Sequence, residues 1–181
     1  MDMLKHWQEL FNTDCKVVKV KNRYVYPIFK CGSSSFFKET KQVIKNAKIE
    51  KLKIITVLIR EPKERFIAGV TTYADLVKQS PKDIIKEIKA NELCNRHFAP
   101  QFIWLLQLHM YYKGEVEIRP YTEIKKYTNE KLFGAGWNAT KVKITPLKNY
   151  IAVDQKLIKK YMNKKVMLPK IIKELIDDVL S

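Results

Sequence analysis

The sequence has few cysteines and no long apolar run. Its three cysteines, Cys15, Cys31 and Cys94, form an odd and widely spaced set, which argues against a disulfide framework and predicts a reducing compartment. The longest apolar runs, such as residues 54–59, fall well short of the ~20 residues that cross a bilayer. The first residues are too polar for a signal peptide. We therefore expect a cytoplasmic protein with no membrane segment.

Metal and nucleotide-hydrolysis motifs are also missing from the sequence. Cys94 and His97 have the spacing of half a zinc site, but a tetrahedral zinc ion needs a second pair and the sequence offers none. No metal is therefore expected. The GxxxxGK[ST] loop of nucleoside triphosphatases is absent as well, which removes the main support for magnesium-dependent phosphoryl transfer.

Acidic residues are scarce relative to basic ones. The chain has 35 lysines and arginines against 19 aspartates and glutamates, a formal net charge of +16. This charge predicts attraction to anions such as nucleotides, glycans or nucleic acid, without choosing among them. The basic residues are mostly lysines spread along the chain, and no helix-turn-helix, zinc-finger or aromatic RNA-binding motif is present. A basic nucleic-acid-binding protein is therefore an alternative that the charge alone supports.

The apolar pattern predicts a single α/β domain covering residues 1–181. A β-branched and aromatic segment at 24–29 is followed by a loop, an amphipathic segment at 35–44 and an apolar segment at 53–59. A strand–helix–strand unit of about 36 residues has the length of a βαβ crossover and predicts parallel strands. We expect a small parallel β-sheet flanked by helices, with a helical C-terminal part. The other expected strands are 16–20 and 116–118, and the other expected helices are 3–11, 66–77, 84–88, 98–112, 153–162 and 168–180.

The loop after the segment 24–29 has the composition of an oxyanion site. Where a strand ends and a helix begins, free backbone N–H groups and the helix dipole point toward an anion. The glycine permits a bend and a close ligand approach, the serines add hydroxyl donors, and the lysine adds a charge. A second interpretation is that the serines only cap the helix. The residues concerned are Lys30, Cys31, Gly32, Ser33, Ser34 and Ser35.

Three segments resemble motifs of the PAPS-dependent sulfotransferase superfamily, and its carbohydrate sulfotransferase branch most closely. Residues 30–36 (KCGSSSF) resemble the phosphosulfate-binding loop. Residues 60–66 (REPKERF) resemble the Arg-x-Pro-x-x-Arg-Phe segment, whose first arginine binds the 3′-phosphate. Residues 95–101 (NRHFAPQ) are similar to a His-aromatic-x-Pro-Gln stretch of the carbohydrate branch. The motifs occur in family order, and the resemblance covers residues 24–101.

The resemblance implies a P-loop-like sulfotransferase fold and a sulfuryl transfer reaction. The co-substrate would be 3′-phosphoadenosine 5′-phosphosulfate (PAPS), and the acceptor a hydroxyl on a carbohydrate or another acidic molecule. Lys30 to Ser35 and Arg60 would bind the nucleotide, and Lys30 would meet the charge that grows on the leaving group. His97 is the candidate general base, with Glu39 and Glu92 as alternatives. A structural role for His97, as a helix N-cap or core-edge residue, is the competing interpretation.

Two positions depart from the family pattern. Ala68 stands where the family usually has a serine that contacts the 3′-phosphate. Its absence removes a bond worth about 1.5–3 kcal/mol, unless Thr71, Thr72 or a lysine substitutes. Phe29 replaces the proline that usually precedes the lysine. These departures support a second alternative, a sulfotransferase fold that binds nucleotide or glycan without turnover.

Three further residues carry competing interpretations. Arg60 could pair at the surface with Glu61 or Glu64 instead of a ligand. Arg65, inside the expected helix, is interpreted as a structural salt-bridge partner. Trp137, in a glycine-rich loop, is a candidate to stack on adenine.

Overall fold

The computed structural model describes residues 7, 9, 11–90, 92–129 and 147–180. Six strands in this part of the chain form one open sheet in the order β3-β1-β2-β4-β5-β6. The β2–β4 and β4–β5 pairs are parallel, and the β3–β1, β1–β2 and β5–β6 pairs are antiparallel. The strands are β1 (Lys16–Val20), β2 (Arg23–Tyr26), β3 (Gln42–Lys45), β4 (Ile54–Ile59), β5 (Glu115–Pro120) and β6 (Lys165–Met167).

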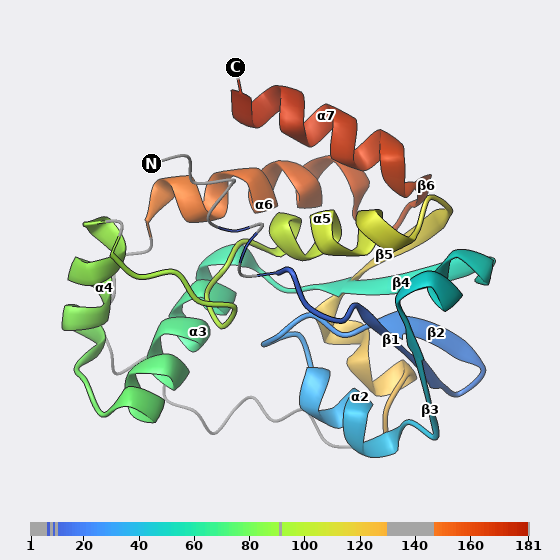
Figure 1. Cartoon of the computed structure of the whole chain (residues 1–181), viewed down its shortest axis with the longest axis horizontal. Coiled ribbons are helices and arrows are strands. Elements are labelled where there is room, and N and C mark those ends of the chain that lie inside the picture. Colours follow the sequence, from blue (N-terminus) through green and yellow to red (C-terminus); the bar gives the residue numbers. More distant parts are fainter. Residues whose placement is uncertain (1–6, 8, 10, 91, 130–146, 181) are drawn as a thin grey trace.

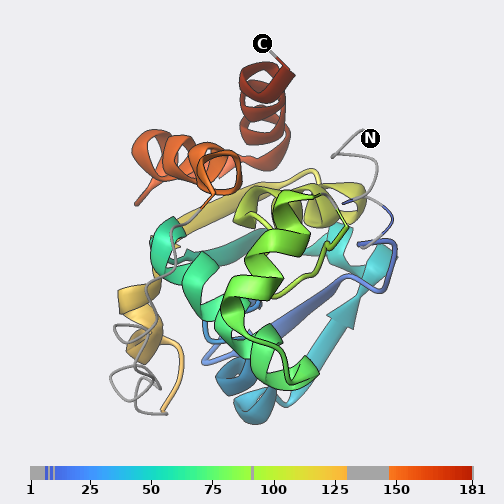
Figure 2. The same cartoon turned by 90° about the vertical axis from the view of Figure 1, so that its left-hand side faces the viewer.

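Helices cover both faces of this sheet (Figure 1). The larger core cluster joins one face to α3, α5, α6 and α7, while the smaller cluster joins the other face to α2 and η2. Figure 2 shows α6 and α7 next to each other, and both also pack on α5. The helices are α2 (Ser33–Glu39), η1 (Asn46–Lys51), α3 (Pro62–Val77), α4 (Pro81–Lys89), α5 (Gln101–Tyr111), η2 (Tyr121–Lys126), α6 (Lys148–Tyr161) and α7 (Leu168–Leu180).

The alternation of side chains along the strands explains the two core clusters. In β1, Val17 belongs to the larger cluster and Val18 to the smaller one. In β4, Val57 and Ile59 belong to the larger cluster and Leu58 to the smaller one. Successive residues of a strand point to opposite faces, so the apolar residues on both faces of β4, interrupted only by the buried Thr56, give a strand that is covered on both sides.

The mixed α/β architecture and the parallel pairing of the strands at 24–29 and 53–59 are confirmed. The expectation of a parallel sheet is wrong for its outer strands, because β1, β3 and β6 pair antiparallel with their neighbours. The helix expected at 35–44 ends at Glu39, and β3 begins at Gln42. Val43 and Ile44 pair with β1, so pairing across the sheet overrides their helical spacing.

Some predictions fall on residues outside the described part. The helix expected at 3–11 lies mostly there, and so does Trp137 with its glycine-rich loop. Among the described helices, none is both long and apolar enough to cross a membrane.

The three parallel strands place their following loops at one edge of the sheet. β2, β4 and β5 are adjacent and run in the same direction, so Lys30, Arg60 and Tyr121 all follow carboxyl ends of neighbouring strands. In open α/β sheets, ligands bind at this edge. The fold therefore brings two of the motifs identified in the sequence side by side.

Candidate anion-binding site

The loop after β2 turns sharply into α2. The Cys31 N–H donates to the Ile28 carbonyl at 3.1 Å, and Lys30 within this turn has a left-handed backbone with φ 66°. A lysine at positive φ is uncommon and must be held there by its surroundings. Gly32 (φ 84°) is the N-cap of α2, and among the described residues no side chain forms a cap hydrogen bond at this helix start. Ser33 to Ser35 form the first turn of α2, so they are not its N-cap.

Gly32 is needed for its backbone and for packing from η2. A Cβ added to Gly32 would lie 2.0 Å from Ile124 Cδ1 and 3.5 Å from Tyr121 Cε2. The space that a side chain would fill at Gly32 is thus taken by η2. A positive φ also favours glycine at this position.

Lys30 extends from this loop toward α3. Its ammonium donates to Thr72 Oγ1 at 2.6 Å. Burial lowers the pKa of Lys30, and the positive charges of Arg60 and Arg65 lower it further. Thr72 therefore brings a hydroxyl beside the lysine, in the same helix as Ala68. Thr71 instead donates to the Ile67 carbonyl at 2.8 Å within the same helix.

Arg60 follows β4 and lies against the Lys30 loop. Its Nη1 donates to the Lys30 carbonyl at 3.4 Å, and its guanidinium carbon lies 5.2 Å from the centre of the Tyr121 ring. Its Nε is 3.6 Å from the Glu64 carboxylate, which is largely exposed. An ion pair with an exposed carboxylate contributes little to stability. Arg60 therefore has one of the surface partners considered for it, Glu64, and also contacts the Lys30 loop. Tyr121 was not singled out from the sequence, although it comes soon after the expected strand at 116–118 and directly follows β5.

Arg65 is buried between the β2 loop and the segment before α5. Nε donates to the Phe29 carbonyl at 3.0 Å, and Nη1 donates to the Ala99 carbonyl. Within the described residues, these two carbonyls replace the salt bridge expected for Arg65, and its Nη2 is buried without a hydrogen-bond partner. Burial lowers the pKa of Arg65. Arg65 therefore adds a desolvated cation beside Lys30 and Arg60.

His97 is half-buried on the same side of the fold. Its Nδ1 lies 2.7 Å from Asn95 Oδ1, which also accepts the backbone N–H of His97 at 3.0 Å. Since that atom accepts one N–H already, it is the amide oxygen, and Nδ1 must carry the ring proton. Nε2 is then the basic nitrogen. Burial lowers the pKa of His97, and Lys30 and Arg65 lower it further, so the ring is neutral near pH 7.

The competing roles for these residues are also placed by the structure. The N-cap of α5 is Pro100 and not His97. Among the alternative bases, Glu39 accepts the Asn129 N–H at 2.6 Å, and Glu92 is exposed outside the helices. In addition to burial, Lys30 and Arg65 lower the pKa of His97, so among the candidate bases it is His97 that lies close to the cations of the site.

Two buried polar residues, Asp154 and Gln101, lie behind the loops, and only Gln101 belongs to a motif noted in the sequence. Asp154 of α6 accepts the N–H groups of Gln101 at 2.7 Å and Phe102 at 2.9 Å, so it caps α5 from a different helix. Burial raises the pKa of Asp154, and the nearby Arg65 opposes this rise. The amide of Gln101 contacts Arg60 and Cys31. Sequence reasoning missed Asp154 and did not foresee the contacts of Gln101, because the partners of both are distant in the chain.

No protein-family model, curated protein or solved structure matches this chain. What the site can do must therefore be judged from its geometry. Lys30, Arg60 and Arg65 converge where two parallel strands end: beyond the effect of burial, Arg60 and Arg65 lower the pKa of Lys30, and Arg60 lowers the pKa of Arg65. Like charges in a partly buried place are relieved when an anion binds between them. The arrangement suits a phosphate or sulfate group, with the basic nitrogen of His97 nearby.

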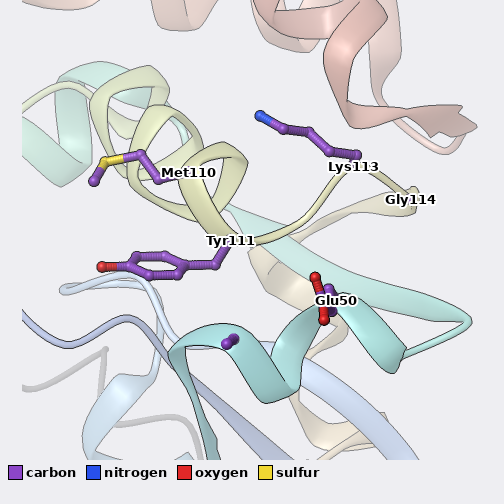
Figure 3. Close-up of a pocket in the computed structure, with 6 residues that line it drawn as sticks. Glu50, Met110, Tyr111, Lys113 and Gly114 are labelled. Carbon is purple, nitrogen blue, oxygen red and sulfur yellow. The ribbon is translucent and has the colours of Figure 1, made fainter.

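A separate hollow of about 430 Å³ lies at the opposite end of the parallel strands (Figure 3). Its lining comes from η1 and from the end of α5, just before β4 and β5 begin. Glu50 and Lys113 supply one charge of each sign, and both are exposed. The cation cluster and this hollow are therefore distinct places. Across the described ranges, no three His, Cys, Asp or Glu side chains gather as a metal ion would require.

Proposed function

We propose that this chain is a sulfotransferase that binds PAPS at the loops after β2 and β4 and moves its sulfuryl group to an acceptor hydroxyl. The observation that carries the proposal is the convergence of Lys30, Arg60 and Arg65 at the carboxyl ends of adjacent parallel strands. Two of these cations were predicted from motifs that lie 30 residues apart in the chain. On this proposal, the β2–loop–α2 unit is the P-loop-like element of a sulfotransferase fold.

The proposed division of roles follows from the contacts. Lys30 and the first turn of α2 would hold the 5′-phosphosulfate, because backbone N–H groups at a helix start and a mobile ammonium suit an oxyanion. Arg60 would hold the 3′-phosphate, since an arginine can make two parallel hydrogen bonds to it. Thr72 would supply the hydroxyl that Ala68 lacks. Its present partner is the Lys30 ammonium, 2.6 Å away.

The reaction would be an in-line displacement at sulfur. The acceptor oxygen forms a bond to sulfur while the bond from sulfur to the bridging phosphate oxygen breaks. That oxygen keeps the electron pair, and Lys30 stabilises its charge. The acceptor hydroxyl proton goes to His97 Nε2, the unprotonated ring nitrogen. A pKa below the ordinary value of 6.5 keeps His97 ready to accept that proton at neutral pH.

Thermal unfolding with adenosine 3′,5′-bisphosphate, the product nucleotide, tests the proposal. A ligand at 100 times its Kd stabilises a native protein by ~2.7 kcal/mol, which for a chain of this size raises the Tm by about 5–10 °C. We expect this rise in the wild type and its loss in Lys30→Ala and Arg60→Ala. Lys89→Ala and Lys41→Ala are matched controls, since they remove exposed charges elsewhere and should keep the full rise.

Each outcome bears on a stated alternative. No rise in the wild type would refute the sulfotransferase proposal. An equal loss in the control variants would indicate general attraction to a basic surface, as for a nucleic-acid-binding protein. If binding is confirmed, formation of adenosine bisphosphate from PAPS in the presence of hydroxyl acceptors tests transfer. If the wild type binds the nucleotide but transfers no sulfuryl group, and His97→Ala behaves in the same way, the chain is the catalytically inactive form of the fold.

A further inference from the structure

One buried side chain joins the two proposed anion-binding loops. Gln101, the first residue of α5, is fully buried. Its Oε1 accepts the Arg60 N–H at 2.9 Å and the Cys31 thiol at 3.2 Å. Its Nε2 donates to the Arg60 carbonyl at 2.9 Å and to Asp154 Oδ2 at 3.3 Å. Residues from four separate segments therefore meet at one amide.

The orientation of this amide is determined by its partners. The Arg60 N–H can only donate and the Arg60 carbonyl can only accept, so a flipped amide would set like groups against each other on both sides. Both N–H donors and both acceptor positions of the Gln101 amide are used in these hydrogen bonds. Arg60 lies just beyond β4, where its backbone has left the ladder of the sheet. The Gln101 side chain thus makes the two backbone hydrogen bonds with Arg60 that a neighbouring strand would otherwise make.

Asp154 completes the arrangement from behind. Its carboxylate accepts the Gln101 backbone N–H at 2.7 Å as well as the Gln101 side chain. The start of α5 and the amide group of its first residue are therefore held by the same acid. In a buried place, hydrogen bonds of this kind are strong and their loss is costly. Rotation of the Gln101 side chain would break contacts to Arg60, Cys31 and Asp154 together.

We propose that Gln101 is a positioning residue that holds the Arg60 and Lys30 loops in register, with Asp154 orienting Gln101. The Cys31 thiol donates to Gln101, and Cys31 directly follows Lys30. The same amide therefore positions the backbone at both Lys30 and Arg60. The effect of Gln101 on nucleotide binding rests on the proposed function. The restraint of the Arg60 backbone by Gln101 is independent of that function, because it can be measured without any ligand.

The experiment compares Gln101→Met with Gln107→Met. Gln107 is a second buried glutamine on α5, which accepts from the Tyr26 hydroxyl at 2.8 Å and donates to the Phe11 carbonyl at 2.9 Å. Both variants lose a buried amide from one helix, but only Gln101 contacts the loops. By NMR, the Arg60 N–H should exchange with solvent about tenfold faster or more in Gln101→Met, as the loss of one hydrogen bond predicts, and at the wild-type rate in Gln107→Met.

The binding arm uses adenosine 3′,5′-bisphosphate and calorimetry. Gln101→Met should weaken binding by about tenfold or more, and Gln107→Met should not. If the wild type does not bind this nucleotide, the proposed function fails while the exchange arm still decides the role of Gln101. Unchanged exchange at Arg60 in Gln101→Met, or an equal increase in Gln107→Met, would overturn the positioning role.

Gln101→Glu separates positioning from simple loss of packing. A glutamate carboxylate at this position keeps one oxygen to accept the Arg60 N–H. Its second oxygen lies against two other acceptors, the Arg60 carbonyl and the Asp154 carboxylate. Arg65 and the Cys31 thiol also lie close. When protonated, the carboxyl regains one donor. Arg60 exchange, corrected for the wild type at each pH, should therefore be fast at pH 8 and recover toward pH 5. Absence of recovery in a folded variant would contradict the proposal, and this variant decides the question if Gln101→Met does not fold.

Discussion

The contact between Gly69 and the His97 segment predicts an unusual effect of adding one methyl group. Gly69 is buried in the middle of α3. A Cβ at this position would lie 2.1 Å from the His97 carbonyl oxygen, 2.6 Å from its carbon and 2.9 Å from Phe98 Cα. All three atoms belong to the backbone, so no side-chain rotation can relieve the clash. Gly69→Ala must therefore displace either α3 or the segment that carries the candidate base.

Two effects of opposite sign decide the magnitude. Replacing a helical glycine by alanine would by itself stabilise the helix by about 1 kcal/mol. Overpacking of a filled core costs about 1–3 kcal/mol and more where backbone must move. At contacts near 2 Å the clash should win. With the overpacking cost at its upper end of about 3 kcal/mol and the gain of about 1 kcal/mol subtracted, we expect the free energy of unfolding to fall by about 2 kcal/mol and the Tm to fall by roughly 4–8 °C.

Urea unfolding followed by circular dichroism measures this change. Ala68→Gly is the matched control, because it alters helix propensity one residue away and should cost about 1 kcal/mol with no clash. The sign of the Gly69→Ala effect is the decisive result. A variant that is more stable than the wild type would show that the His97–Phe98 backbone yields freely, and that α3 does not determine where His97 lies.

Two further predictions concern the charges of the site. In an NMR titration, His97 should have a pKa below the ordinary 6.5, and Lys30→Ala should raise it because a neighbouring positive charge is removed; His109, which has a different lysine neighbour, should not change. Because the folded-state pKa of His97 is lowered, stability should decline as the pH falls below 6.5, and His97→Gln should weaken that decline. Arg65→Met leaves two backbone carbonyls unpaired and should lower the unfolding free energy by about 2–4 kcal/mol in urea. Arg65→Lys should not restore it, because an ammonium lacks the planar fork of the guanidinium; a wild-type stability in that variant would contradict the role assigned to Arg65.

The position of the site was accessible from the sequence to a limited degree. Apolar segments at 24–29 and 53–59 indicated neighbouring parallel strands, and cations after both strands then had to share one edge of the sheet. Lys30 and Arg60 could be predicted in this way. Tyr121 follows the third parallel strand and could have been found by the same rule. Thr72 was named as a substitute for the missing serine and Gln101 ends the third motif, but their contacts could not be predicted, because their partners come from segments 30 or more residues away.

The sequence alone determined the local features: that the segments of β1, β2, β4 and β5 are strands, where the helix-starting loop with its glycine and serines lies, and the order of the two cationic motifs. These depend on side-chain periodicity and on preferences of neighbouring residues. Only the tertiary structure decided that β3 is a strand, that Ile124 fills the space beside Gly32, and that Arg65 binds carbonyls. The physical reason is that backbone pairing, close packing and the burial of polar groups depend on residues far apart in the chain.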